Sequence, residues 1–139
     1  LNPDPFQGSI LFGVPSSIVF NGLLFFPAQA STSQGVELCV SDGTAAGTQL
    51  FADLLPGTGG SSPDAFFEFN NHLFFTAIVP GGQRKLWISD GTPGGTQLFG
   101  DITMTSGQQS YIVVNNKMYF YNYICIHVKY YQRNVYGMS

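Results

Sequence analysis

Short apolar segments alternate with Gly-, Pro- and Asn-rich turns along the chain, and none of them has the spacing of an amphipathic helix. Residues 16–20 and 23–28 flank Asn21-Gly22, a pair that adopts positive φ at both central positions of a tight hairpin turn. Residues 36–40 and 48–53 follow as two further apolar segments. The pattern therefore predicts four strands in one antiparallel meander.

The same order of segments occurs again further along the chain. The second copy has a predicted turn at Asn70-Asn71, and its predicted strands are residues 65–69, 72–77, 85–88 and 96–101. A third copy begins with residues 111–114 and 117–120, which flank Asn115-Asn116. A period of roughly 20–50 residues is typical of repeat architectures, in which each unit buries its apolar faces against its neighbours.

The strands carry apolar side chains on both faces. Leu23-Leu24-Phe25-Phe26 and Leu86-Trp87-Ile88 are examples, since successive side chains of a strand point to opposite faces. A sheet of a two-layer sandwich keeps a polar outer face, whereas the blades of a propeller pack face to face. We therefore predict an all-β fold of four-stranded antiparallel meanders, arranged as β-propeller-like blades in an incomplete ring.

The repeat pattern divides the chain into four parts. They are the end of a preceding repeat or a linker at 1–15, a first blade at 16–63, a second at 64–110, and a partial third with an atypical Tyr-rich tail at 111–139. Leu1-Asn2-Pro3 resembles the segments that follow Asp53 and Asp101, so we expect the chain to enter within a repeat of a larger ring. The tail is either a capping element or an artefact of how the coding sequence was assembled, and both interpretations stay open.

The most regular feature is a turn with the pattern Ser-Asp-Gly-Thr-x-x-Gly-Thr, which occurs at residues 41–48 and again at 89–96. One carboxylate in each loop is far fewer than the six to eight oxygen ligands that calcium prefers. An Asp that accepts backbone N–H bonds, next to a Gly with positive φ, is typical of a structural turn. The residues assigned this structural role are Asp42, Gly43, Thr44, Asp90, Gly91 and Thr92.

With its flanking residues, this turn resembles the ELWxxDGT repeat. The two copies read Glu37-Leu38-Cys39-Val40-Ser41-Asp42-Gly43-Thr44 and Lys85-Leu86-Trp87-Ile88-Ser89-Asp90-Gly91-Thr92. Cys39 stands where the family has Trp, and Lys85 where it has Glu. The resemblance covers roughly residues 10 to 120. It implies propeller-like blades in large secreted or surface-exposed proteins, mostly bacterial, with no activity assigned to the motif.

Composition and charge narrow the classes of function. Only 9% of the residues are charged and 44% are hydrophobic, which suits a β-rich protein outside the cytoplasm and predicts an extracytoplasmic location. The net charge is −3 and no dense basic stripe is present, which argues against nucleic-acid binding. The longest apolar runs fall far short of the roughly 20 residues that a membrane-spanning helix needs.

The cysteines and histidines give no sign of a metal or cofactor site. Cys39 and Cys125 form either one disulfide or two packed thiols, and the sequence leaves both open. His72 and His127 are single and scattered, whereas a zinc site needs a cluster of ligands. We therefore predict no metal and no cofactor.

Two groups of side chains are candidates for carbohydrate recognition or chemistry. Trp87 could stack on a sugar, although its place in a central strand favours a role in the core between blades. Glu37, Glu68 and Asp64 could supply the two carboxylates of a glycosidase, although their non-equivalent repeat positions argue against it. No nucleophile motif accompanies either histidine, so we predict that the chain is not an enzyme.

The tail is rich in tyrosine, a residue enriched at protein interfaces. It forms either an interface or an edge strand, and the candidate interface residues are Tyr119, Tyr121, Tyr123, Tyr130 and Tyr131. An incomplete ring leaves an apolar blade face at each end, which calls for a partner. The sequence thus predicts a non-enzymatic structural or protein-binding module of a larger extracytoplasmic assembly, whose partner is the remaining blades, further copies or another subunit. A carbohydrate-binding or glycoside-acting propeller is the alternative.

Overall fold

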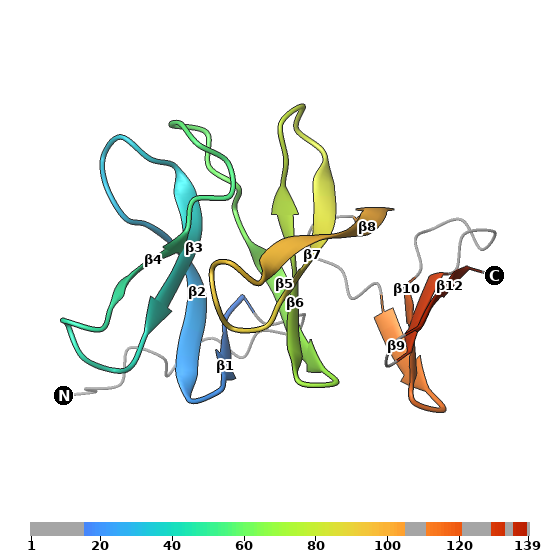
Figure 1. Cartoon of the computed structure of the whole chain (residues 1–139). Coiled ribbons are helices and arrows are strands. Elements are labelled where there is room, and N and C mark those ends of the chain that lie inside the picture. The colour runs from blue at the N-terminus through green and yellow to red at the C-terminus, as the bar shows by residue number, and fades with distance from the viewer. Residues whose placement is uncertain (1–15, 105–110, 121–128, 133–134, 139) are drawn as a thin grey trace, which may run out of the picture.

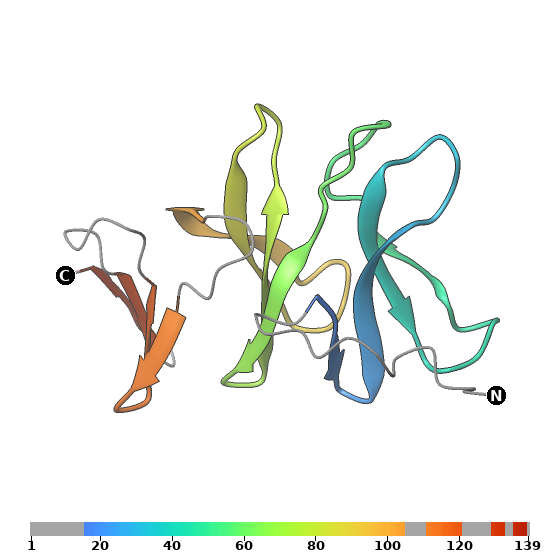
Figure 2. The ribbon, with the colours of Figure 1, turned by 180° about the vertical axis from the view of Figure 1, so that it is seen from behind.

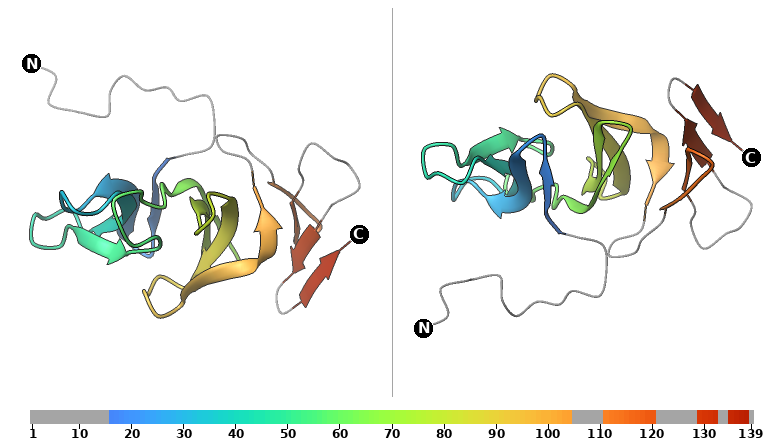
Figure 3. Two further views of the ribbon diagram at one scale, coloured as in Figure 1. Left: turned by 90° about the horizontal axis from the view of Figure 1, so that it is seen from above. Right: turned by 90° about the horizontal axis from the view of Figure 1, so that it is seen from below.

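The computed structural model describes residues 16–104, 111–120, 129–132 and 135–138, and within these ranges the protein is all-β. Its strands form three four-stranded sheets, in which each strand pairs with its sequence neighbours, and no sheet closes into a barrel. We call them the first, second and third sheets. They stand side by side in chain order (Figures 1, 2 and 3). No helix in the described ranges is long and apolar enough to cross a membrane.

The first two sheets have the predicted strand order. They contain β1 (Ile18–Phe20), β2 (Leu23–Gln29), β3 (Val36–Ser41), β4 (Gln49–Ala52), β5 (Asp64–Phe69), β6 (His72–Ile78), β7 (Arg84–Ser89) and β8 (Thr96–Thr103). The largest departures from the predicted ends are at β1, which begins at Ile18 rather than 16, and β8, which ends at Thr103 rather than 101. The prediction of an all-β class built from four-stranded antiparallel meanders is confirmed.

The third sheet uses the chain's tail for half of its strands. It contains β9 (Tyr111–Val114), β10 (Lys117–Phe120), β11 (Lys129–Gln132) and β12 (Val135–Met138). The sequence predicted β9 and β10 and left the tail as either an interface or an edge strand, because the tail lacks the Ser-Asp-Gly-Thr turn. In the structure Tyr130 and Tyr131 of β11 pair with Tyr119 and Met118 of β10, which places these two tail tyrosines in a strand.

Each sheet begins with the same hairpin turn. The two central residues of all three turns have positive φ: Asn21 (51°) and Gly22 (76°), Asn70 (50°) and Asn71 (59°), Asn115 (51°) and Asn116 (58°). Positive φ at both positions is the requirement of a type I′ turn, and Asn and Gly tolerate it better than other residues. All three turns lie at the same end of their sheets, at the lower edge of Figure 1.

The second sheet is buried on both faces. Along β6, Leu73, Phe75 and Ala77 belong to a first core shared with the first sheet, whereas Phe74 belongs to a second core that includes Met118 of the third sheet. The first core consists of Phe20, Phe25, Leu38, Val40, Phe66, Leu73, Phe75 and Ala77. The second consists of Phe67, Phe69, Phe74, Leu86, Ile88, Phe99, Ile102, Met104 and Met118. The strand period of two thus divides β6 between two interfaces.

Corresponding aromatic residues make the same contacts in the first two sheets. The ring centroids of Phe25 and Phe51 lie 5.0 Å apart at an interplanar angle of 81°. Those of Phe74 and Phe99 lie 5.3 Å apart at 77°. Edge-to-face pairs of this kind contribute about 0.5–1.5 kcal/mol beyond their buried area. The two sheets therefore correspond in side-chain packing as well as in strand order.

Phe75 stacks on two other aromatic rings in the first core. Its ring is fully buried and stacks on those of Phe66, at 5.6 Å, and Trp87, at 6.2 Å. We expect Phe75→Ala to lower the free energy of unfolding by about 3–5 kcal/mol, because truncating a buried aromatic leaves a cavity. Urea unfolding followed by far-ultraviolet circular dichroism measures it.

Val19→Ala is the control for Phe75→Ala, because Val19 is 64% exposed on β1. An exposed substitution of this kind changes stability by no more than about 0.5 kcal/mol. Equal losses in the two variants would contradict the assignment of Phe75 to the core between the sheets.

Candidate functional site

A buried carboxylate on β3 holds the connection between the first and second sheets. Glu37 is fully buried, and its two oxygens accept hydrogen bonds from Leu54 N (2.9 Å), Leu55 N (3.2 Å) and Ser61 N (2.9 Å). The hydroxyl of Ser61 donates a fourth bond. A carboxylate can be buried when several N–H groups replace its water, and here those groups come from a single loop. Glu37 therefore fixes the path of the chain from one sheet to the next.

The end of this connection is bonded to both sheets. Ser62 N donates to Val36 O of the first sheet (2.9 Å), and Ile78 N of the second sheet donates to Ser61 O (2.7 Å). The guanidinium of Arg84 donates to Ser62 O (2.9 Å) from β7. Because both sheets bind neighbouring residues of one loop, the loop determines how the two sheets are placed against each other.

Lys85 occupies the position in the second copy that Glu37 has in the first, and its contacts differ. Its Nζ donates to Asp101 Oδ1 (2.5 Å) and to Thr103 Oγ1 (3.0 Å), both on β8 of the same sheet. The Asp101 side chain is 90% exposed, so this ion pair is screened by water. Lys85 thus joins two strands within a sheet, whereas Glu37 joins a sheet to the following connection.

The three carboxylates weighed as a glycosidase set have separate environments. Glu37 is enclosed by its four donors and has no exposed surface for a substrate. Glu68 is exposed on β5, and Asp64 accepts a hydrogen bond from Ala65 N (2.8 Å). The carboxylate of Glu37 is thus occupied by the fold, which leaves it no role as a catalytic acid or nucleophile.

The first Ser-Asp-Gly-Thr turn is a closed set of short hydrogen bonds. Asp42 Oδ1 accepts from both the N–H (2.9 Å) and the hydroxyl (2.6 Å) of Thr44. The Thr44 hydroxyl accepts a hydrogen bond from Gly47 N (2.9 Å), and the Thr44 carbonyl accepts one from the Thr48 hydroxyl (2.6 Å). The hydroxyls of Thr48 and Ser41 lie 2.6 Å apart. The polar groups of the motif therefore serve the turn itself.

The second turn has the same bonds. Asp90 Oδ1 accepts from the N–H (2.9 Å) and the hydroxyl (2.6 Å) of Thr92, and Gly95 N donates to that hydroxyl (3.0 Å). In both turns the threonine bonds lower the pKa of the aspartate, the side-chain bond more than the backbone bond. Each carboxylate is thus held ionised and already bound within its turn. Among the described residues, no three His, Cys, Asp or Glu side chains gather as a metal site requires.

The two glycines of each turn are required for different reasons. Gly43 and Gly91 have φ of 94° and 97°, a conformation that strains other residues. A Cβ on Gly47 or Gly95 would lie only 2.0 Å from the Oδ1 of the aspartate of the same turn. The spacing of Asp and the second Gly in the motif therefore follows from steric contact.

The second turn also packs against the first sheet. A Cβ on Gly91 would lie 3.2 Å from the ring of Phe20 and 3.3 Å from the Asn21 side chain, so the β7–β8 turn contacts the β1–β2 hairpin. The corresponding position in the first sheet, Gly43, has no described atom within 4 Å of a Cβ placed there. The same kind of turn thus lies in an interface in one sheet and is open in the other.

Trp87 lies within the interface between the first two sheets. Its indole is half-buried, stacks on the Phe75 ring at an interplanar angle of 10° and packs against the first core. Its Nε1 is buried without a hydrogen-bond partner among the described residues. A sugar needs an exposed face of the indole on which to stack. The contact with Phe75 covers one of the two faces.

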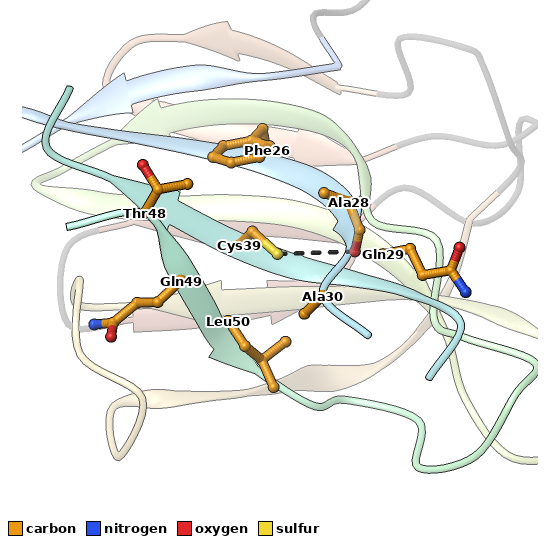
Figure 4. Close-up of a pocket in the computed structure, with 8 residues that line it drawn as sticks. All are labelled: Phe26, Ala28, Gln29, Ala30, Cys39, Thr48, Gln49 and Leu50. Atoms are coloured by element: carbon orange, nitrogen blue, oxygen red, sulfur yellow. Dashed lines mark hydrogen bonds between the residues drawn. The ribbon is translucent and has the colours of Figure 1, made fainter. Parts of the chain in front are cut away.

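Cys39 takes the position of Trp87 in the first sheet, and a groove lies beside it. Cys39 is a buried free thiol whose Sγ lies 3.8 Å from Ala28 O, and burial raises its pKa. The groove has a volume of about 270 Å³, and Figure 4 shows Phe26 and Leu50 on the strands that flank Cys39. It is lined by Phe26, Ala28, Gln29, Ala30, Cys39, Thr48, Gln49 and Leu50. An indole fills the corresponding position of the second sheet.

The structure describes some of the remaining candidate residues. Tyr119 is half-buried on β10, and Tyr130 and Tyr131 lie on β11. The Nδ1 of His72 lies 2.9 Å from Asn70 O, within the β5–β6 hairpin. Outside the described residues lie Tyr121, Tyr123, Cys125 and His127.

Sequence reasoning did not find the role of Glu37 or the groove. The signal for both was the difference between the two copies of the repeat, at Glu37 against Lys85 and at Cys39 against Trp87. No protein-family model, curated protein or solved structure matches the chain. The evidence for function is therefore the residues and geometry described above.

The contact between Asp90 and Gly95 gives a stability test. We expect Gly95→Ala to lower the free energy of unfolding by about 1–3 kcal/mol, because its Cβ overlaps the carboxylate. Gly94→Ala is the matched control, since a Cβ on Gly94 meets no described atom within 4 Å. In an Asp90→Ala background the loss caused by Gly95→Ala should shrink, which a double-mutant cycle in urea measures. An undiminished loss would show that the carboxylate is not the cause.

The bonds of Glu37 give a second test. Glu37→Ala leaves three backbone N–H groups without their acceptor, and each costs about 1–3 kcal/mol. We expect a total loss of about 3 kcal/mol or more, with faster hydrogen exchange at the amides of Leu54, Leu55 and Ser61. Glu68→Ala, an exposed substitution on β5, is the control and should cost no more than about 0.5 kcal/mol. Unchanged exchange at the three amides in Glu37→Ala would refute the assignment.

Proposed function

We propose that this chain is a non-enzymatic structural or protein-binding module of propeller-type repeats, and that it forms one part of a larger extracytoplasmic assembly. The observation that best supports this function is the second sheet, whose two faces pack against different neighbours. A propeller blade makes this pair of contacts with the blades on either side of it.

The polar residues of the motif support a scaffold rather than a catalytic site. Asp42 and Asp90 bind the threonines of their own turns, and Glu37 binds the connection between two sheets. A catalytic or ligand-binding group needs an accessible atom that the fold does not already use. These contacts agree with the resemblance to the ELWxxDGT repeat, whose motif has no assigned activity.

The composition supports the proposed location. With 9% charged residues, the exposed surface depends on Ser, Thr, Asn, Gln and Gly for its polarity. The exposed loop between β2 and β3 is an example, since Ser31, Ser33 and Gln34 bond to one another there. A surface of this kind suits a secreted or surface-exposed β protein.

Duplication of the middle unit tests the scaffold function. In a repeat protein each unit contacts only its neighbours, so an added unit is accommodated and contributes its own interface. We expect a chain with a second tandem copy of residues 64–110 to fold and to unfold in urea with a larger m-value, because more surface is exposed. A folded chain whose m-value equals that of the parent, with the added segment cleaved by protease, would contradict the proposal.

Titration with soluble oligosaccharides tests the carbohydrate alternative. Trp87 is the single tryptophan of the chain, and its ring packs on Phe75. The scaffold function predicts that sugars leave its fluorescence unchanged. A saturable change in emission would favour the carbohydrate-binding propeller.

A further inference from the structure

The outer face of the first sheet is the face turned away from the second sheet. It carries residues like those of an interface between sheets, but these residues are less buried. Strand β2 aligns with β6 through their hairpin turns, so Leu24, Phe26 and Ala28 correspond to Leu73, Phe75 and Ala77. The three residues of β6 are 0% exposed beneath the first sheet. The three residues of β2 are only half-buried. This face therefore corresponds to one that is covered elsewhere in the same chain.

The far face of the third sheet is the face turned away from the second sheet. It exposes a position that the other two sheets bury. Val114 precedes the β9–β10 turn as Phe20 and Phe69 precede the turns of the first and second sheets. Phe20 is 1% exposed and Phe69 is 9% exposed, and each belongs to the core shared with the following sheet. Val114 is 45% exposed. The third sheet thus presents, uncovered, a position that the other two bury against a neighbour.

The β10 strand supports the same conclusion. Tyr119 corresponds to Phe25 and Phe74, which are both 0% exposed in the two cores. Tyr119 is half-buried. The chain therefore carries both halves of the sheet-to-sheet interface that it uses twice internally, one half on its first sheet and the other on its third.

We propose that copies of this chain associate head to tail, with the outer face of the first sheet of one copy packed against the far face of the third sheet of the next. The association deepens the proposed function and rests on it, because the contact continues the stacking of sheets seen within the chain. The groove beside Phe26 and Cys39 gives the covering sheet room for a large side chain. The open Gly43 turn receives the hairpin turn of that sheet, as Gly91 receives Asn21.

The two copies contribute different faces, so the contact is heterologous. The smallest assembly with such a contact is a dimer joined by one interface, and further copies add in the same direction.

Native mass spectrometry and analytical ultracentrifugation of the full chain test this proposal. Phe26→Lys on the outer face and Val114→Lys on the far face should each raise the dissociation constant at least about tenfold, because an unpaired ammonium is buried in an apolar contact. The corresponding residues Phe75 and Phe20 are 0% and 1% exposed where a sheet covers them. Leu98→Lys is the control for Phe26→Lys, since Leu98 is 44% exposed on a sheet that is covered within the chain. Val36→Lys, at a residue 37% exposed, is the control for Val114→Lys.

Mixing the two disrupting variants identifies the direction of the contact. In a head-to-tail dimer, a Phe26→Lys copy keeps an intact third sheet and a Val114→Lys copy keeps an intact first sheet, so the mixture should form a heterodimer through that one intact contact. A face that paired with itself would give no such rescue.

Three results would overturn the proposal: a parent chain that is monomeric at its highest attainable concentration, a dimer that survives both substitutions, or a mixture that gives no heterodimer. Circular dichroism and urea unfolding of each variant show whether it is folded, which separates loss of association from loss of structure. The m-value of the tandem duplicate tests the scaffold function within one chain, so the two proposals can fail independently.

Discussion

The carboxylate of Glu37 determines how the first two sheets are arranged. Its oxygens bind three backbone N–H groups of the connection that leads to β5, and the end of this connection is bonded in turn to β3, β6 and β7. Burial of the charge is favourable only while these donors stay in place. The bonds of Glu37 and those at Ser61 and Ser62 together hold the connection, and with the first core they fix how the faces of the two sheets meet.

The Ser-Asp-Gly-Thr turns act at two levels. Locally, the aspartate and threonine bond to each other, which leaves the turn without a need for outside partners. At the level of the sheets, Gly91 allows the second turn to approach Phe20 and Asn21 of the neighbouring hairpin. The motif thus fixes a strand connection and, where a neighbour is present, part of the interface with that neighbour.

The parts of the structure that depend on local sequence could be predicted. The hairpins at Asn21, Asn70 and Asn115 follow from backbone preference, and the strands from apolar segments between turns. The role of Glu37 could not, because its donors lie far along the chain from it and no local pattern marks them. Strands β11 and β12 could not be placed because the tail lacks the turn motif, and the sequence left it as an interface or an edge strand. The groove was missed because it depends on how the side chains around Cys39 pack in space.

The order of the strands also bears on how the chain folds. Every described ladder joins strands that are adjacent in the sequence, so each pairing closes only a short loop and costs little chain entropy. Each sheet can therefore nucleate on its own, and folding should be fast for an all-β protein. Similar neighbouring units carry a risk of exchanging strands during folding. Glu37 and Lys85 differ at corresponding positions: Glu37 binds the connection to the second sheet, whereas Lys85 binds β8 of its own sheet, so the two units are not interchangeable at this position.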